Sequence, residues 1–77
     1  MKLEQYKKAM DGAFRVSVNV ARKNGNRFGY IHGYLNGNLE GIKDMAISDM
    51  DLSENDYDLL IAYARKLKED FDEGKSI

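Results

Sequence analysis

One acidic run contains the residue types that bind hard cations. Four oxygen-bearing side chains occupy alternate positions of the stretch DMDLSENDYDLL, namely Asp49, Asp51, Ser53 and Asn55. They match the first ligand positions of a calcium loop, but that loop also needs a glycine sixth and a bidentate glutamate twelfth. Glu54 and Leu60 stand there instead. The run therefore predicts the start of a helix with solvated carboxylates, and no metal site is expected.

Few residues in this chain are of the types that commonly act in catalysis. There is no cysteine, which excludes disulfides and thiolate zinc sites, and His32 is the single histidine. None of the serines stands at a spacing that pairs it with His32 as a nucleophile with its base. We therefore expect no catalytic residue and no cofactor, and we predict that the chain is not an enzyme.

Glycine recurs at every fourth residue of the stretch GNRFGYIHGYLNGNLEG, from Gly25 to Gly41. Each interior glycine costs a helix about 0.8–1 kcal/mol relative to alanine, and a solvated face gains nothing in return. Missing Cβ atoms do let two backbones approach closely, as small residues at this spacing do in membrane helix pairs. The row therefore predicts that another backbone lies against it, either a helix of the same chain or a partner.

Two tyrosines flank the glycines, and they supply contact area at low entropic cost. The predicted partner-binding residues are Gly29, Tyr30, Gly33, Tyr34, Gly37 and Gly41. The alternative is that Tyr34 belongs to the edge of the core and that Tyr30 only covers surface methylenes. The expected occupant is a protein partner or a second copy of the chain.

Charge is distributed unevenly along the chain. Residues 1–38 carry seven Lys and Arg against two acids, whereas residues 39–77 carry five against eleven. Oppositely charged helices that pack together would explain this, and so would a basic face for an acidic partner or a nucleic acid. The basic stripe for that second use is Lys8, Arg15, Arg22, Lys23 and Arg27. Glu4 and Asp11 interrupt it.

Apolar spacing predicts helices at about 2–23, 27–49 and 54–72. The first follows Leu3, Met10 and Phe14, and the second follows steps of three and four from Phe28 to Ala46. The third begins at Ser53, a good N-cap, with acids in its first turn. The preferred fold is an all-α three-helix bundle formed by a single domain over residues 1–77.

A second reading of the first half is an α+β fold, with a β-hairpin between two helices. Phe14, Val16, Val18 and Val20 alternate with polar residues, and Asn24-Gly25 is a strong hairpin signal. Against this reading, residues 3–23 segregate their charge well on a helical wheel. A strand also offers no reason for a glycine spacing of four.

The stretch GYIHGYLNGNLEGIKDMAI resembles the glycine-every-fourth-residue helices of some bacterial export regulators and the tails of some mobile-element proteins. The likeness covers residues 25–47. We expect a cytoplasmic, regulatory or inhibitory interaction module, since MKLEQYKKAM lacks an apolar signal region and no run reaches membrane-spanning length. The alternative function is a nucleic-acid-associated regulator that uses the basic stripe.

Overall fold

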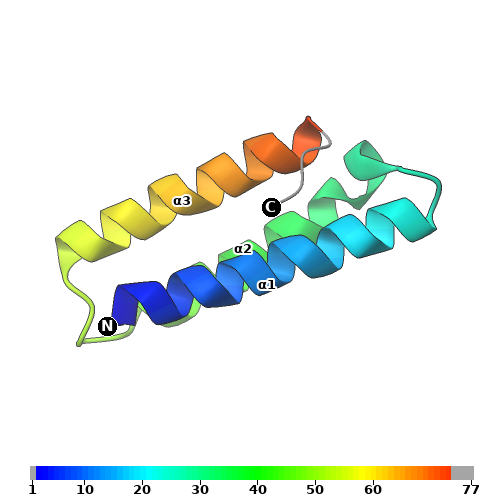
Figure 1. Cartoon of the computed structure of the whole chain (residues 1–77). Coiled ribbons are helices and arrows are strands. Elements are labelled where there is room, and N and C mark those ends of the chain that lie inside the picture. The colour runs from blue at the N-terminus through cyan, green and yellow to red at the C-terminus, as the bar shows by residue number, and fades with distance from the viewer. Residues whose placement is uncertain (1, 74–77) are drawn as a thin grey trace.

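Three helices lie side by side along the length of the molecule (Figure 1). The computed structural model describes residues 2–73, which form α1 (Lys2–Lys23), α2 (Phe28–Ile47) and α3 (Glu54–Asp72). α2 runs opposite to α1 and α3 (Figure 1). Each helix contacts the other two, and the body measures 41 × 16 × 16 Å. The predicted all-α three-helix bundle is confirmed.

The hairpin alternative is wrong, because residues 2–23 are helical without interruption. A strand would place Phe14, Val16 and Val18 on one face. In the structure Phe14 and Val18 are buried, whereas Val16 is 48% exposed. Asn24 and Gly25 do form a turn, but it joins two helices. Gly25 takes a φ of 75°, a conformation that glycine adopts without strain.

The second helix is shorter than the predicted range of 27–49. Arg27 is its N-cap and has non-helical dihedral angles, so the helix begins at Phe28. At the other end the Ser48 hydroxyl donates to the carbonyl oxygen of Asp44 at 3.0 Å. The third helix begins as predicted, because the hydroxyl of Ser53 accepts the backbone N–H of Asp56 at 3.1 Å.

The core is a continuous strip of apolar side chains from all three helices. Three aromatic rings meet in this strip, near the start of α2 and the end of α3: Phe71 lies edge-on to Phe14 and Phe28, with ring centroids 6.1 and 5.2 Å away. The fully buried side chains also include Met10, Leu35, Leu39 and Leu60. This strip holds the helices together and leaves their outer sides to solvent.

Ser17 is the exception within the core. Its side chain is fully buried, and its hydroxyl has no hydrogen-bond partner among the described residues. A buried unpaired hydroxyl costs about 1–3 kcal/mol. We expect Ser17→Ala to raise the free energy of unfolding by about 1 kcal/mol or more, measured by urea denaturation.

Ser53→Ala is the matched control, because the same chemical change there removes a helix cap and should cost about 0.5–2 kcal/mol. A loss of stability in Ser17→Ala would show that the hydroxyl is satisfied in the folded state.

Candidate interaction face

The glycine row lies on the outer side of α2. Gly29, Gly33, Gly37 and Gly41 are all exposed. A Cβ atom added at any of them would meet no atom within 4 Å. The explanation that α1 or α3 packs across the glycines is therefore wrong, and no compensating contact of the described residues offsets their cost to the helix.

Large side chains stand beside these glycines. Tyr30 is 80% exposed, Tyr34 is 50% exposed and Met45 is 65% exposed. Because half of Tyr34 is exposed, the alternative that it belongs to the edge of the core does not hold. With Gly37 and Gly41, the three large residues form one stripe with steps of three and four.

Polar contacts define which side of α1 faces each neighbour. The Tyr6 hydroxyl donates to Asp49 at 2.6 Å, which turns that side of α1 toward the end of α2. This hydrogen bond is the main cause that lowers the pKa of Asp49 and raises the pKa of Tyr6. The Tyr63 hydroxyl donates to Asp11, and Lys7 Nζ lies 5.3 Å from the centroid of the Tyr63 ring. That side of α1 therefore faces α3.

The Tyr63–Asp11 hydrogen bond gives the fold a dependence on alkaline pH. The bond to the carboxylate, with burial, raises the pKa of Tyr63 from 10.0 to about 12. Because the folded-state pKa is the higher one, this stabilisation is complete below pH 10 and is lost as the pH rises toward about 12. We expect a late tyrosine ionisation in an ultraviolet absorbance titration.

Tyr63→Phe should abolish that late ionisation and flatten the fall in stability over the same pH interval. An unchanged titration curve in Tyr63→Phe would contradict the assignment.

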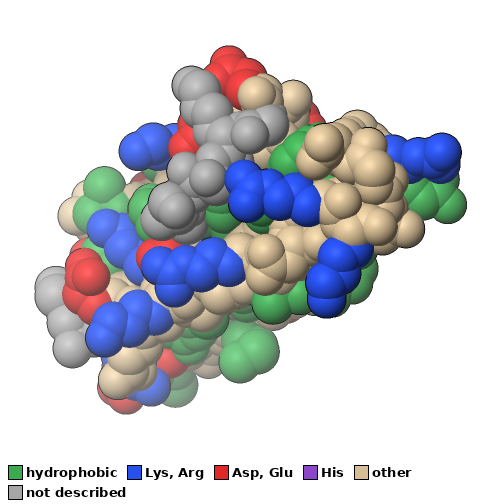
Figure 2. Space-filling view, turned by 45° about the vertical axis from the view of Figure 1, so that its right-hand side comes forward, with side chains coloured by type: hydrophobic (Ala, Val, Ile, Leu, Met, Phe, Trp, Pro, Cys, Tyr) green, Lys and Arg blue, Asp and Glu red, His purple; other side chains and the backbone are tan. Residues whose placement is uncertain are grey.

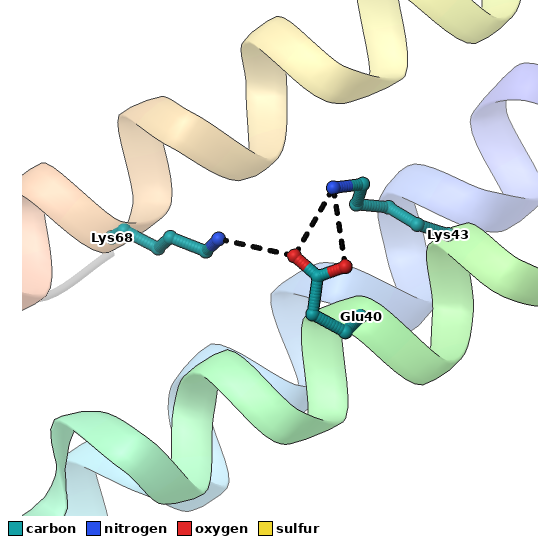
Figure 3. Close-up of polar contacts among 3 residues, drawn as sticks. All are labelled: Glu40, Lys43 and Lys68. Carbon is teal, nitrogen blue, oxygen red and sulfur yellow. Dashed lines mark hydrogen bonds and ion pairs between the residues drawn. The ribbon is translucent and has the colours of Figure 1, made fainter.

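A second set of polar contacts joins α2 to α3 (Figure 3). Glu40 accepts hydrogen bonds from Lys43 at 3.1 and 3.3 Å and from Lys68 of α3 at 3.5 Å. The contact with Lys43 is the main cause that lowers the pKa of Glu40. His32 Nδ1 lies 2.7 Å from a carboxylate oxygen of Asp72. These contacts turn one side of α2 toward α3, so the side with Tyr34 and Met45 is next to α1.

The flank of α1 beside this part of α2 carries no charge along its middle. We call the combined surface the α1–α2 face, and its residues are Gln5, Ala9 and Val16 of α1 with Tyr30, Tyr34, Gly37, Asn38, Gly41 and Met45 of α2. All of them are exposed. Lys23 and Asp44 stand at its borders. Since 32% of the residues in the chain are charged, this uncharged surface is unusual.

The α1–α2 face holds part of the predicted site and adds residues that were not predicted. Tyr30, Tyr34, Gly37 and Gly41 belong to it. Four residues advance an α-helix by about 40° beyond a full turn, so the row drifts around α2 and leaves Gly29 and Gly33 on the side toward α3. The α1 residues of the face were not predicted, because an exposed position of one helix gives no sign of the neighbour beside which it lies.

The basic stripe lies outside the α1–α2 face, and only Lys23 stands at the border between the two. Lys8, Arg15 and Arg22 are exposed on the flank of α1 toward α3, and Lys23 and Arg27 are exposed near the α1–α2 turn. Among the described residues, the ion pairs involve none of these five cations. In the view of Figure 2, Lys and Arg side chains lie across the middle of the surface, with acidic side chains mainly at its margins.

The two acids that interrupt the basic stripe both have partners. Glu4 pairs with Lys7 at 3.9 Å, and Asp11 accepts from Tyr63. An open hollow of about 440 Å³ lies apart from both surfaces, at the α2–α3 connection, between Ile47, Leu52 and Tyr57. Within residues 2–73, no three His, Asp or Glu side chains gather as the ligands of a metal would.

Comparison with known proteins adds no assignment. No protein-family model, curated protein or solved structure matches this chain. Across the described residues, no helix combines the length and apolar character needed to cross a bilayer. A function for the chain is therefore inferred from the residues of the α1–α2 face.

Proposed function

We propose that this chain is a non-catalytic protein-interaction module that binds a helix through the α1–α2 face. The observation that carries the proposal is the combination of open glycines with exposed large side chains on one uncharged surface. Gly37 and Gly41 leave space above the backbone of α2, and Tyr34 and Met45 stand beside that space. A docked helix would bury the large side chains and bring its own backbone close to the glycines.

The glycines of the α1–α2 face lower the stability of α2. Gly37 and Gly41, the two glycines of the face on α2, lie in the interior of that helix and together forfeit about 2 kcal/mol relative to alanine. That is a large fraction of the stability of a small domain, which is about 5–15 kcal/mol. No described residue of the chain uses the space that they leave. A partner backbone that packs into this space would offset the lost helix stability with favourable binding free energy.

The mode of action would be steric. A helix seated on the α1–α2 face is no longer free to pack elsewhere, so occupancy alone regulates or inhibits the protein that supplies it. No bond is made or broken, and no cofactor takes part.

A photo-crosslinking experiment tests the proposal. p-Benzoylphenylalanine would replace Asn38, in the α1–α2 face, or Ala62, which is exposed on α3. In cells that produce the chain, we expect a discrete polypeptide adduct from position 38 and none from position 62. Adding Gly37→Leu should abolish the adduct while circular dichroism shows intact helices. Equal adducts from both positions, or an adduct that survives Gly37→Leu, would contradict the proposal.

The basic stripe supports a second candidate function, the binding of nucleic acid. The supporting observation is that Lys7 and Tyr63 engage the two interrupting acids and leave Lys8, Arg15 and Arg22 exposed. Such a function requires an affinity that falls steeply with salt. Arg15→Glu with Arg22→Glu should abolish that affinity for a DNA or RNA duplex in fluorescence anisotropy. If the unmodified chain has no salt-dependent affinity, this candidate is rejected.

A further inference from the structure

We infer that the helix docked on the α1–α2 face is α2 of a second copy of this chain, in antiparallel orientation. The inference rests on the proposed function and names the partner for that same surface. It follows from the order of large and missing side chains along α2, from the position of the charge on the face, and from its size.

The order of side chains along the stripe is self-complementary when it is reversed. In an antiparallel pair centred between Gly37 and Asn38, Tyr34 of one copy lies opposite Gly41 of the other. Tyr30 then lies opposite Met45, and contacts between aromatic rings and methionine sulfur are favourable. Each exposed tyrosine thus meets either the space left by a missing side chain or a flexible apolar one. A parallel pair would instead place Tyr34 against Tyr34 and leave the glycines opposite one another.

Charge favours this surface over the rest of the molecule for self-association. Two copies joined through the basic stripe would bring like charges together, and so would two copies joined through the acidic start of α3. On the α1–α2 face, Asp44 is the charge at the border of α2. In the antiparallel register the two Asp44 positions are about 20 Å apart along the helices, at a rise of about 1.5 Å per residue. That exceeds the Debye length of about 8 Å at physiological salt, so their repulsion is screened.

The size of the face suits a dimer. One long side of the bundle measures 41 × 16 Å between Cα atoms, and side chains add to it. Interfaces of standard size bury about 800 Å² per partner. The face must use most of its length to reach this area, which the antiparallel register allows because it is centred on α2. Val16 and Ala9 of α1 extend the contact beside the α2 stripe.

Sedimentation equilibrium from micromolar to millimolar concentration tests the inference. We expect the mass to rise from 8.8 kDa to twice that value. Gly41→Leu fills the space assigned to the partner's Tyr34, so it should keep the chain monomeric while circular dichroism shows equal or greater helicity. Ala62→Leu, on the exposed side of α3, is the matched control and should still dimerise.

Engineered cysteines test the orientation, because the natural chain has none. Asn38→Cys lies next to the centre of the pair and should form a disulfide between copies under mild oxidation. Ser48→Cys should not, since the two residues would be about 30 Å apart in the antiparallel register. Efficient Ser48→Cys cross-linking would overturn the orientation, and a dimer that persists in Gly41→Leu would overturn the interface.

A chain that stays monomeric at every concentration overturns self-pairing but not the proposed function. The photo-crosslinking at position 38 would then show a polypeptide adduct other than the chain itself. If the proposed function also fails, that adduct is absent as well, so the two failures are distinguishable.

Discussion

Replacing Gly33, Gly37 and Gly41 together with alanine is expected to stabilise the monomer by about 2–3 kcal/mol. The reason is that each added Cβ enters open space, so the gain in helix propensity is not offset by a clash. For a domain of this size, the change should raise the melting temperature by about 10–20 °C. Thermal denaturation followed by circular dichroism at low micromolar concentration measures it.

The same triple substitution should weaken association through the α1–α2 face, because two of its three positions, Gly37 and Gly41, lie in that face. Stability and binding are therefore expected to move in opposite directions, which a purely structural role for the glycines does not predict. Gly25→Ala is the control, because Gly25 has a φ of 75° and alanine is strained there. It should destabilise the fold and leave association unchanged. A triple variant no more stable than the original chain would show that an intrachain contact already compensates for the glycines.

Phe71→Ala is expected to cost about 3–5 kcal/mol, which is enough to leave a domain of this size largely unfolded. Phe71 is fully buried and is the one ring that lies edge-on to both Phe14 and Phe28, so its removal loosens all three helices. Urea denaturation, or the loss of helical circular dichroism at room temperature, measures the effect.

Leu59→Ala on the same helix is the control for Phe71→Ala. Leu59 is 50% exposed, and its truncation should cost less than about 1 kcal/mol. Similar losses in the two variants would mean that the aromatic cluster does not hold the three helices together.

The fold could be predicted from the sequence because the signals that specify each helix lie within that helix or next to it. The spacing of Phe14, Val18 and Ala21 favoured a helix over a strand, and the exposed position of Val16 agrees with that prediction. Ser53 fixed the start of α3, which was predicted correctly. The ends of α2 were less accurate, because Arg27 and Ser48 lack the strong capping chemistry of Ser53 and leave the boundary to tertiary contacts.

The candidate site was only half predictable. Glycine spacing, which is visible within one helix, predicted four of the α2 residues of the face but not Asn38 or Met45. The α1 residues could not be found, because the side of α1 that lies beside α2 depends on Tyr6 meeting Asp49, 43 positions away in the chain. The same limit hid the Asp11–Tyr63 and His32–Asp72 contacts. Single-helix periodicity indicates which side is buried, but it does not indicate which neighbour each flank meets.

The glycines of α2 also affect how water reaches its backbone. Without side chains at four exposed positions, the amides and carbonyls along one side of the helix are poorly shielded, and the helix has less intrinsic resistance to fraying. We therefore expect amide hydrogens on the outer side of α2 to exchange with deuterium faster than those at matching depths of α1 and α3. A helix docked on the α1–α2 face would exclude water from the backbone there, so slowed exchange confined to residues 37–41 would report occupancy directly.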